Sequence, residues 1–194
     1  MCFAVIATLW GMRILIGFDQ TAGAMGVAPA RWPAPSEIPR DPARPQLLVF
    51  VHPFCPCSAA TLEELERMTA RRTRTSVQPQ MTVLFVRPRG AKGWRSAGLW
   101  DTARQLAGAH VMWDEDGQEA HRFGALTSGD ILLYEAHGIL LFHGGVTGSR
   151  GHAGDNYGAD ELTLALDSGR PVRAPQMVFG CSLAGVGLLA PARE

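Results

Sequence analysis

Apolar runs alternate with amphipathic segments from residue 46 onward, and their order predicts an α/β domain. Residues 46–51, QLLVFV, form a continuous apolar run, which is typical of a strand that is covered on both faces. Residues 58–72 place apolar side chains at helical spacing between charged ones and predict an amphipathic helix. Residues 81–88 predict a second strand, and residues 93–108 predict a second helix.

The second half of this region continues the pattern with shorter elements. Residues 110–117 predict a strand that ends in a turn, and residues 118–123 predict a short helix. Residues 131–145 predict two strands joined as a hairpin, and residues 158–169 predict a closing helix. This order predicts a mixed central sheet with flanking helices.

The N-terminus carries a separate apolar segment. Residues 2–18 contain a single charged side chain, Arg13, and their length is close to the lower limit for a membrane span. We expect residues 1–19 to form a membrane-anchor helix. A cleaved signal segment and a buried or frayed helix are the alternatives, because Arg13 lies near the middle and no basic region precedes the apolar run.

A proline-rich stretch separates this segment from the domain. Residues 20–44 are rich in proline and alanine, and they predict a stiff, extended tether. The predicted domain then covers residues 45–183, and residues 184–194 form a tail.

The amino-acid composition limits the classes of function and partner to be considered. The chain has 194 residues, of which 46% are hydrophobic, and this suits one globular domain with some additional chain. Because 18 basic residues balance 18 acidic ones, no nucleic-acid partner is expected. The four cysteines are too few for a disulfide scaffold. An anchor, a tether and a cysteine-bearing domain predict a domain on the periplasmic or extracytoplasmic, oxidising side of a membrane.

The sequence CPCS at residues 55–58 places two cysteines where they can take part in thiol–disulfide exchange. Proline is favoured at the first position of a helix, so Pro56 makes Cys55 the N-cap, where the helix dipole stabilises a thiolate. Cys57 is then the expected resolving thiol, in a small strained ring suited to exchange. The alternative is a pair of buried cysteines with no chemical task. Glu63 and Glu64, further along this helix, are expected on its solvated face.

Four motifs carry a resemblance to a known family: HPFCPC, RFGALTSGDILLY, GGVTGSRGHAGDN and VFGCSL. Together they are similar to the membrane-tethered TlpA-like thioredoxins and, more narrowly, to the RedB-like proteins. The resemblance covers about residues 45–183. It implies a thioredoxin-like fold and a thiol–disulfide oxidoreductase without a cofactor, whose partner is a thiol or disulfide protein or a small thiol.

The same resemblance implies a substrate groove beside the cysteines. Residues 128–130 are expected to face Cys55 across this groove, and RGHAGDN at residues 150–156, within the glycine-rich loop at residues 144–158, is expected along its rim. The residues expected to line the groove are Pro56, Ser128, Gly129, Asp130, Arg150 and His152. A plain glycine-rich surface loop is the alternative for residues 144–158.

Two positions depart from ordinary thioredoxins. Gly129 stands where the fold relatives carry a cis-proline that faces the thiols, and Val49 stands where they carry a buried acid. His52 is therefore the candidate for proton transfer, and a histidine satisfied at the end of a strand is the alternative.

Cys181 follows the last expected helix, and three roles are open for it. It is a buried residue, a disulfide partner of Cys55 or Cys57, or the third thiolate of a copper(I) or zinc site completed by His52 or His152. The functions to be weighed are therefore an oxidoreductase, a metal carrier or assembly factor, and a binding module that lost its redox activity. We favour a relay of thiols, because a metal requires residues distant in sequence to converge.

Overall fold

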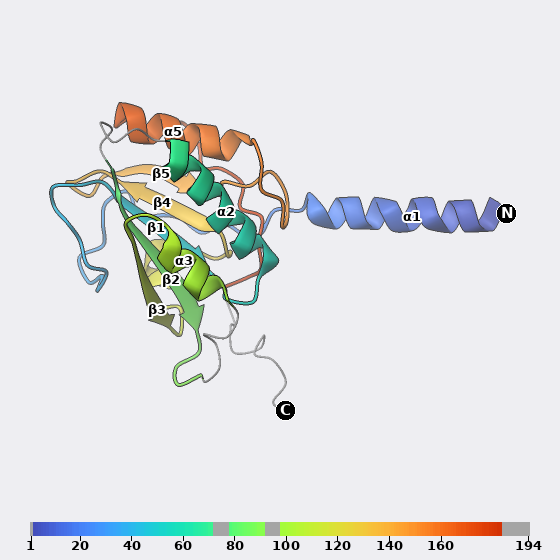
Figure 1. Cartoon of the computed structure of the whole chain (residues 1–194), viewed down its shortest axis with the longest axis horizontal. Helices are drawn as coiled ribbons and strands as arrows, with labels where there is room; N and C mark the ends of the chain where they lie inside the picture. The colour runs from blue at the N-terminus through green and yellow to red at the C-terminus, as the bar shows by residue number, and fades with distance from the viewer. Residues whose placement is uncertain (1, 72–77, 92–97, 184–194) are drawn as a thin grey trace.

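The computed structural model describes residues 2–71, 78–91 and 98–183 (Figure 1). The elements in chain order are α1 (Cys2–Asp19), β1 (Gln46–Val51), α2 (Pro56–Arg71), β2 (Gln80–Arg87), α3 (Leu99–Gln105), β3 (Ala109–Glu115), α4 (Gln118–Phe123), β4 (Asp130–Tyr134), β5 (Leu140–Gly144) and α5 (Tyr157–Ser168). The predicted tail at residues 184–194 lies outside the described residues. Residues 93–97, the start of the helix predicted at residues 93–108, lie outside them as well.

The five strands form one mixed sheet in the order β3-β2-β1-β4-β5. Strand β1 runs parallel to β2 and antiparallel to β4, while β3 is parallel to β2 and β5 is antiparallel to β4. All six residues of β1 are buried, because this strand is central and both faces of the sheet are covered. The predicted mixed sheet with flanking helices is confirmed, and β1 delivers the cysteine motif to the middle of one sheet edge.

Each face of the sheet has its own apolar core. Helices α2, α3 and α5 lie on one face of the sheet (Figure 1). They contribute buried side chains such as Leu62, Trp100 and Leu162. On the other face, Phe123 of α4 packs with Ile38 of the N-terminal segment. The N-terminal segment and the short helix α4 thus both help to cover this face.

Helix α1 projects away from the domain as a straight rod (Figure 1). Its large apolar side chains between Phe3 and Phe18 are exposed wherever the structure describes them. Within the described residues, no helix combines the length and the apolar character needed to cross a membrane. The sequence therefore predicted the helix correctly, but the predicted membrane anchor gains no support.

Residues 20–44, expected to form an extended tether, lie against the domain at several points. The hydroxyl of Tyr134 donates a hydrogen bond to the carbonyl of Pro29 at 2.9 Å. The backbone N–H of Trp32 donates to the carbonyl of Gly138 in the β4–β5 turn at 2.8 Å. These contacts hold the segment to the domain before β1 begins.

Candidate functional site

Cys55 lies between the end of β1 and the start of α2. Its backbone N–H donates to the carbonyl of His52 at 3.1 Å, and its carbonyl accepts from the N–H of Ser58 at 3.0 Å. Helix α2 begins at Pro56, whose lack of an N–H costs nothing in the first helical turn. Local sequence thus places the Cys55 sulfur beside the positive end of a helix.

Cys181 meets Cys55 from the far end of the chain. The two sulfur atoms lie 3.0 Å apart, which is closer than ordinary contact but longer than the roughly 2.05 Å of a disulfide bond. Cys55, Cys57 and Cys181 are all free thiols, and the first two are buried. The structure thus brings Cys181 beside Cys55, and the choice among the three roles open for Cys181 stays a prediction.

The three thiols share one negative charge. A hydrogen bond from the Cys57 thiol, joined by one from Cys181, lowers the pKa of Cys55 to about 4 in spite of burial. The pKa of Cys57 is raised, first by this hydrogen bond to Cys55 and then by burial. Burial and the contact with Cys55 raise the pKa of Cys181 to about 11. At neutral pH, Cys55 is therefore the thiolate, and its two neighbours are protonated donors.

His52 lies at the end of β1 and is buried. Burial lowers its pKa, although the negative charge of Cys55 acts in the opposite direction. The backbone N–H of Phe54 donates to its Nδ1 at 3.2 Å, so this ring nitrogen acts as an acceptor. The ring is neutral at neutral pH, and its role in proton transfer stays a prediction.

Two serine hydroxyls join the cysteine motif to the segment before β4. The Oγ atoms of Ser58 and Ser128 lie 2.6 Å apart, and the backbone N–H of His52 donates to Ser128 Oγ at 2.9 Å. The backbone N–H of Ser128 donates to the carbonyl of Cys181 at 2.8 Å. Ser128 therefore holds both cysteine segments together. Ser58 was missed by the sequence reasoning, although its position directly after the motif could have indicated it.

Gly129 and Asp130 have structural roles that the groove prediction did not include. Gly129 has φ +93°, and a Cβ there would lie 2.8 Å from Thr61 Oγ1, so glycine is required on both counts. The side chain of Asp130 is fully buried, and His143 Nε2 lies 3.3 Å from its carboxylate. Burial raises the pKa of Asp130. The buried Asp130 side chain lies beside His143, so its predicted place in a substrate groove gains no support from the structure.

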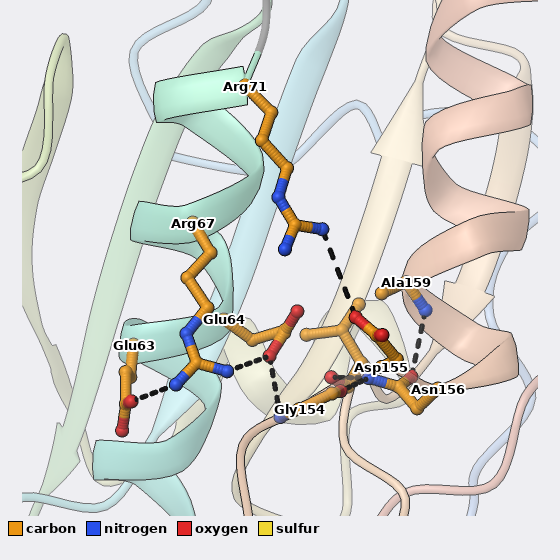
Figure 2. Close-up of polar contacts among 9 residues, drawn as sticks. Glu63, Glu64, Arg67, Arg71, Gly154, Asp155, Asn156 and Ala159 are labelled. Atoms are coloured by element: carbon orange, nitrogen blue, oxygen red, sulfur yellow. Dashed lines mark hydrogen bonds and ion pairs between the residues drawn. The ribbon is translucent and has the colours of Figure 1, made fainter.

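The glycine-rich loop between β5 and α5 is fixed to α2 through Glu64 (Figure 2). The Glu64 carboxylate accepts from the N–H of Gly154 at 2.9 Å and lies 3.6 Å from the Arg67 guanidinium. Asn156 caps α5 by accepting from the N–H of Ala159 at 2.9 Å. The expectation of a solvated Glu64 is wrong, since this buried carboxylate exchanges water for a backbone donor and a guanidinium.

The loop reaches the thiols through its glycine and arginine residues. A Cβ at Gly151 would lie 4.0 Å from Pro56 Cβ, and the Gly151 backbone acts to lower the pKa of Cys57 against the causes that raise it. Arg150 Nη1 donates to the carbonyl of Gly180, next to Cys181, at 2.7 Å. His152 is exposed, and its Nδ1 lies 2.7 Å from the carbonyl of Arg150. The loop therefore borders the cysteine site.

The alternative metal site is not assembled in the described part of the chain. No group of three or more His, Cys, Asp and Glu side chains there is arranged to hold a metal ion. His152, proposed from the sequence as a ligand beside the three cysteines, instead contacts a backbone carbonyl of its own loop.

No protein-family model matches this chain, and no curated protein is significantly similar to it. Solved structures are similar in fold. A hypothetical protein from Sinorhizobium meliloti 1021 superposes with a TM-score of 0.59 at 16% identity, over 85% of this chain and 96% of that chain. An uncharacterized conserved protein from Geobacillus kaustophilus gives a TM-score of 0.58 at 15% identity, over 90% of this chain and 95% of that chain.

A weaker similarity is found to a secreted disulfide oxidoreductase from Mycobacterium tuberculosis. Its TM-score is 0.39 at 18% identity, over 65% of this chain and 82% of that chain. The two matches with TM-scores of 0.59 and 0.58 show a shared fold alone, because their identities of 16% and 15% say nothing of the reaction. Membership of the RedB-like family stays a prediction. The mixed sheet, with flanking helices and the cysteine motif directly after its central strand, agrees with the α/β arrangement that the sequence resemblance implied.

Proposed function

We propose that the protein is a thiol–disulfide oxidoreductase in which Cys55 attacks a substrate disulfide and Cys181 resolves the intermediate. One observation carries this proposal: the Cys55 sulfur lies 3.0 Å from the Cys181 sulfur. The pKa of Cys55, lowered to about 4, makes its sulfur the nucleophile at neutral pH.

The reaction then needs no further oxidant or reductant. The Cys55 thiolate attacks one sulfur of a disulfide, which forms a mixed disulfide and releases the other sulfur as a thiolate. Cys181 loses its proton to that leaving thiolate and attacks the Cys55 sulfur. A Cys55–Cys181 disulfide forms, the second substrate sulfur leaves as a thiolate, and the substrate has gained the two electrons that the protein has lost. The reverse sequence oxidises a dithiol substrate.

Cys57 has a different part in this scheme. The sequence predicted it as the resolving thiol, but the Cys181 sulfur lies in direct contact with the Cys55 sulfur, at 3.0 Å. We assign to Cys57 the stabilisation of the Cys55 thiolate, because its hydrogen bond is the largest cause of the lowered pKa. Cys181 approaches on a separate segment, so its disulfide with Cys55 closes a long loop.

The partner in this proposal is a disulfide or dithiol protein, or a small thiol, located on the extracytoplasmic side. Disulfide exchange is favoured in oxidising compartments, whereas cytosolic thiols are kept reduced. A fusion to a reporter that is active only outside the cytoplasm tests this placement. An inactive reporter on an intact fusion would contradict it.

The direct test is disulfide mapping on the full-length chain. Reduced protein is treated with glutathione disulfide, quenched with acid and analysed by peptide mass spectrometry. Wild-type protein and Cys57→Ala are expected to form the Cys55–Cys181 disulfide, while Cys181→Ala accumulates glutathione on Cys55. A wild-type protein that forms only a Cys55–Cys57 disulfide, or none, would overturn the proposal.

A further inference from the structure

Arg150 connects the segment that carries Cys181 to the N-terminal part of the chain. Its Nη1 donates to the carbonyl of Gly180 at 2.7 Å, and its Nε donates to the carbonyl of Thr21 at 3.0 Å. Its backbone N–H donates to the carbonyl of Asp19, the last residue of α1, at 2.9 Å. The guanidinium carbon lies 4.9 Å from the ring centroid of Phe18. One side chain thus spans two segments that are far apart in sequence.

The peptide groups on both sides of Cys181 are held by hydrogen bonds. Arg150 binds the carbonyl of Gly180, which precedes Cys181, and the N–H of Ser128 binds the carbonyl of Cys181 itself. Ser182 forms an antiparallel bridge with Thr127. Among these partners, Arg150 binds the segment through a charged side chain. Ser128 and Thr127 bind it through their backbone groups.

The fit of this segment leaves little freedom. A Cβ at Gly180 would lie 1.9 Å from the carbonyl oxygen of Ser128, so only glycine allows such a close approach. The Cys181 sulfur is directed at Cys55 only while this short segment keeps its position. A contact that fixes the Gly180 carbonyl therefore controls the sulfur-to-sulfur distance.

Arg150 also acts on the charge of the resolving thiol. Burial and the neighbouring Cys55 raise the pKa of Cys181, and the Arg150 guanidinium acts in the opposite direction. Cys181 must become a thiolate before it attacks the mixed disulfide. Once Cys55 is part of the mixed disulfide, it no longer carries a negative charge. The Arg150 guanidinium then favours the thiolate form of Cys181.

We propose that Arg150 is a positioning residue for the resolving step, which holds the Gly180 carbonyl so that Cys181 faces Cys55. This assignment rests on the proposed oxidoreductase function and replaces the substrate-groove role that the sequence suggested for Arg150. It places Arg150 outside direct contact with the reacting sulfurs, because its side chain binds backbone carbonyls.

The test measures two quantities on the full-length chain in glutathione redox buffers. The first is the equilibrium constant for the Cys55–Cys181 disulfide, obtained by peptide mass spectrometry. A hydrogen bond from a charged donor is worth at most roughly one to two powers of ten in an equilibrium constant. Because the bond to Gly180 already forms in the free-thiol state, Arg150→Ala is expected to lower the constant by up to about tenfold, through the lost position of Cys181. Arg150→Lys retains a cationic donor and is expected to recover most of the loss. Arg89→Ala removes an exposed arginine paired with Asp116 and serves as the matched control.

The second quantity is the rate at which a preformed Cys55–glutathione mixed disulfide releases glutathione, followed against pH. Loss of the cation is expected to move the midpoint of this profile to higher pH in Arg150→Ala. A purely structural loosening would lower the rate by the same factor at every pH, with no rescue by lysine, and that result would overturn the inference.

The two proposals fail in different ways. A wild-type protein that forms no Cys55–Cys181 disulfide overturns both. A wild-type protein that forms this disulfide, with an Arg150→Ala variant whose equilibrium constant and pH profile match those of Arg89→Ala, overturns only the role of Arg150.

Discussion

The reactivity of Cys55 should depend on the hydrogen-bond donor at position 57, and two substitutions there separate the donor from the rest of the side chain. Cys57→Ala removes the donor, whereas Cys57→Ser keeps a hydroxyl that can donate to the Cys55 sulfur. The Cys57 thiol is the first cause of the lowered pKa of Cys55, about 4, and the Cys181 thiol adds to it. We expect Cys57→Ala to raise this pKa and Cys57→Ser to change it less.

The size of the change follows from the energy of one charged hydrogen bond. Such a bond contributes about 1.5–3 kcal/mol, and one pKa unit corresponds to 1.36 kcal/mol. The pKa of Cys55 should therefore rise by roughly one to two units in Cys57→Ala. The increase is partial, because the Cys181 thiol still lies 3.0 Å from the Cys55 sulfur and continues to stabilise its charge.

The assay is the rate of iodoacetamide alkylation at Cys55 as a function of pH, resolved by peptide mass spectrometry. Near pH 5, a rise of one to two units lowers the thiolate fraction, and with it the rate, by about twofold to tenfold. Wild-type protein provides the reference curve. An unchanged midpoint in Cys57→Ala, or equal shifts in the alanine and serine variants, would refute the idea that Cys57 acts as a donor.

Two further predictions concern stability. Because the folded pKa of Cys55, about 4, lies below its ordinary value of 9.0, the folded protein binds fewer protons between these values. The Cys55 contribution to the free energy of unfolding is thus complete above about pH 9 and is lost as the pH falls toward 4, with a slope of at most about 1.4 kcal/mol per pH unit. Thermal melts of reduced protein should show this slope, and Cys55→Ser should lack it; parallel pH profiles would contradict the assignment. Gly129→Ala should lower the free energy of unfolding in urea by at least about 1 kcal/mol more than Gly90→Ala, because both glycines have positive φ but only Gly129 has a close neighbour, at 2.8 Å. Equal losses would show that backbone conformation alone determines the cost.

Much of the fold could be predicted from local sequence pattern. The strand at residues 46–51 and the helix at residues 118–123 have the predicted bounds, because a continuous apolar run and helical spacing are properties of neighbouring residues. The start of α2 at Pro56 was also predicted, since proline at the first helical position is a local preference. The position of Cys55 before that helix therefore followed from the sequence.

The composition of the site depended on the tertiary structure. Cys55 and Cys181 are 126 residues apart, and no sequence periodicity shows that the segment after α5 returns to the end of β1. The inward direction of Asp130 and the burial of Glu64 had no local signal, because a carboxylate is buried only where distant groups pair with it. The sequence by itself determined which residues could do thiol chemistry and where the helix that activates Cys55 begins. The order of strands in the sheet and the return of the C-terminal segment decided which thiol faces Cys55, because contacts over such sequence separations are set by packing of the whole chain.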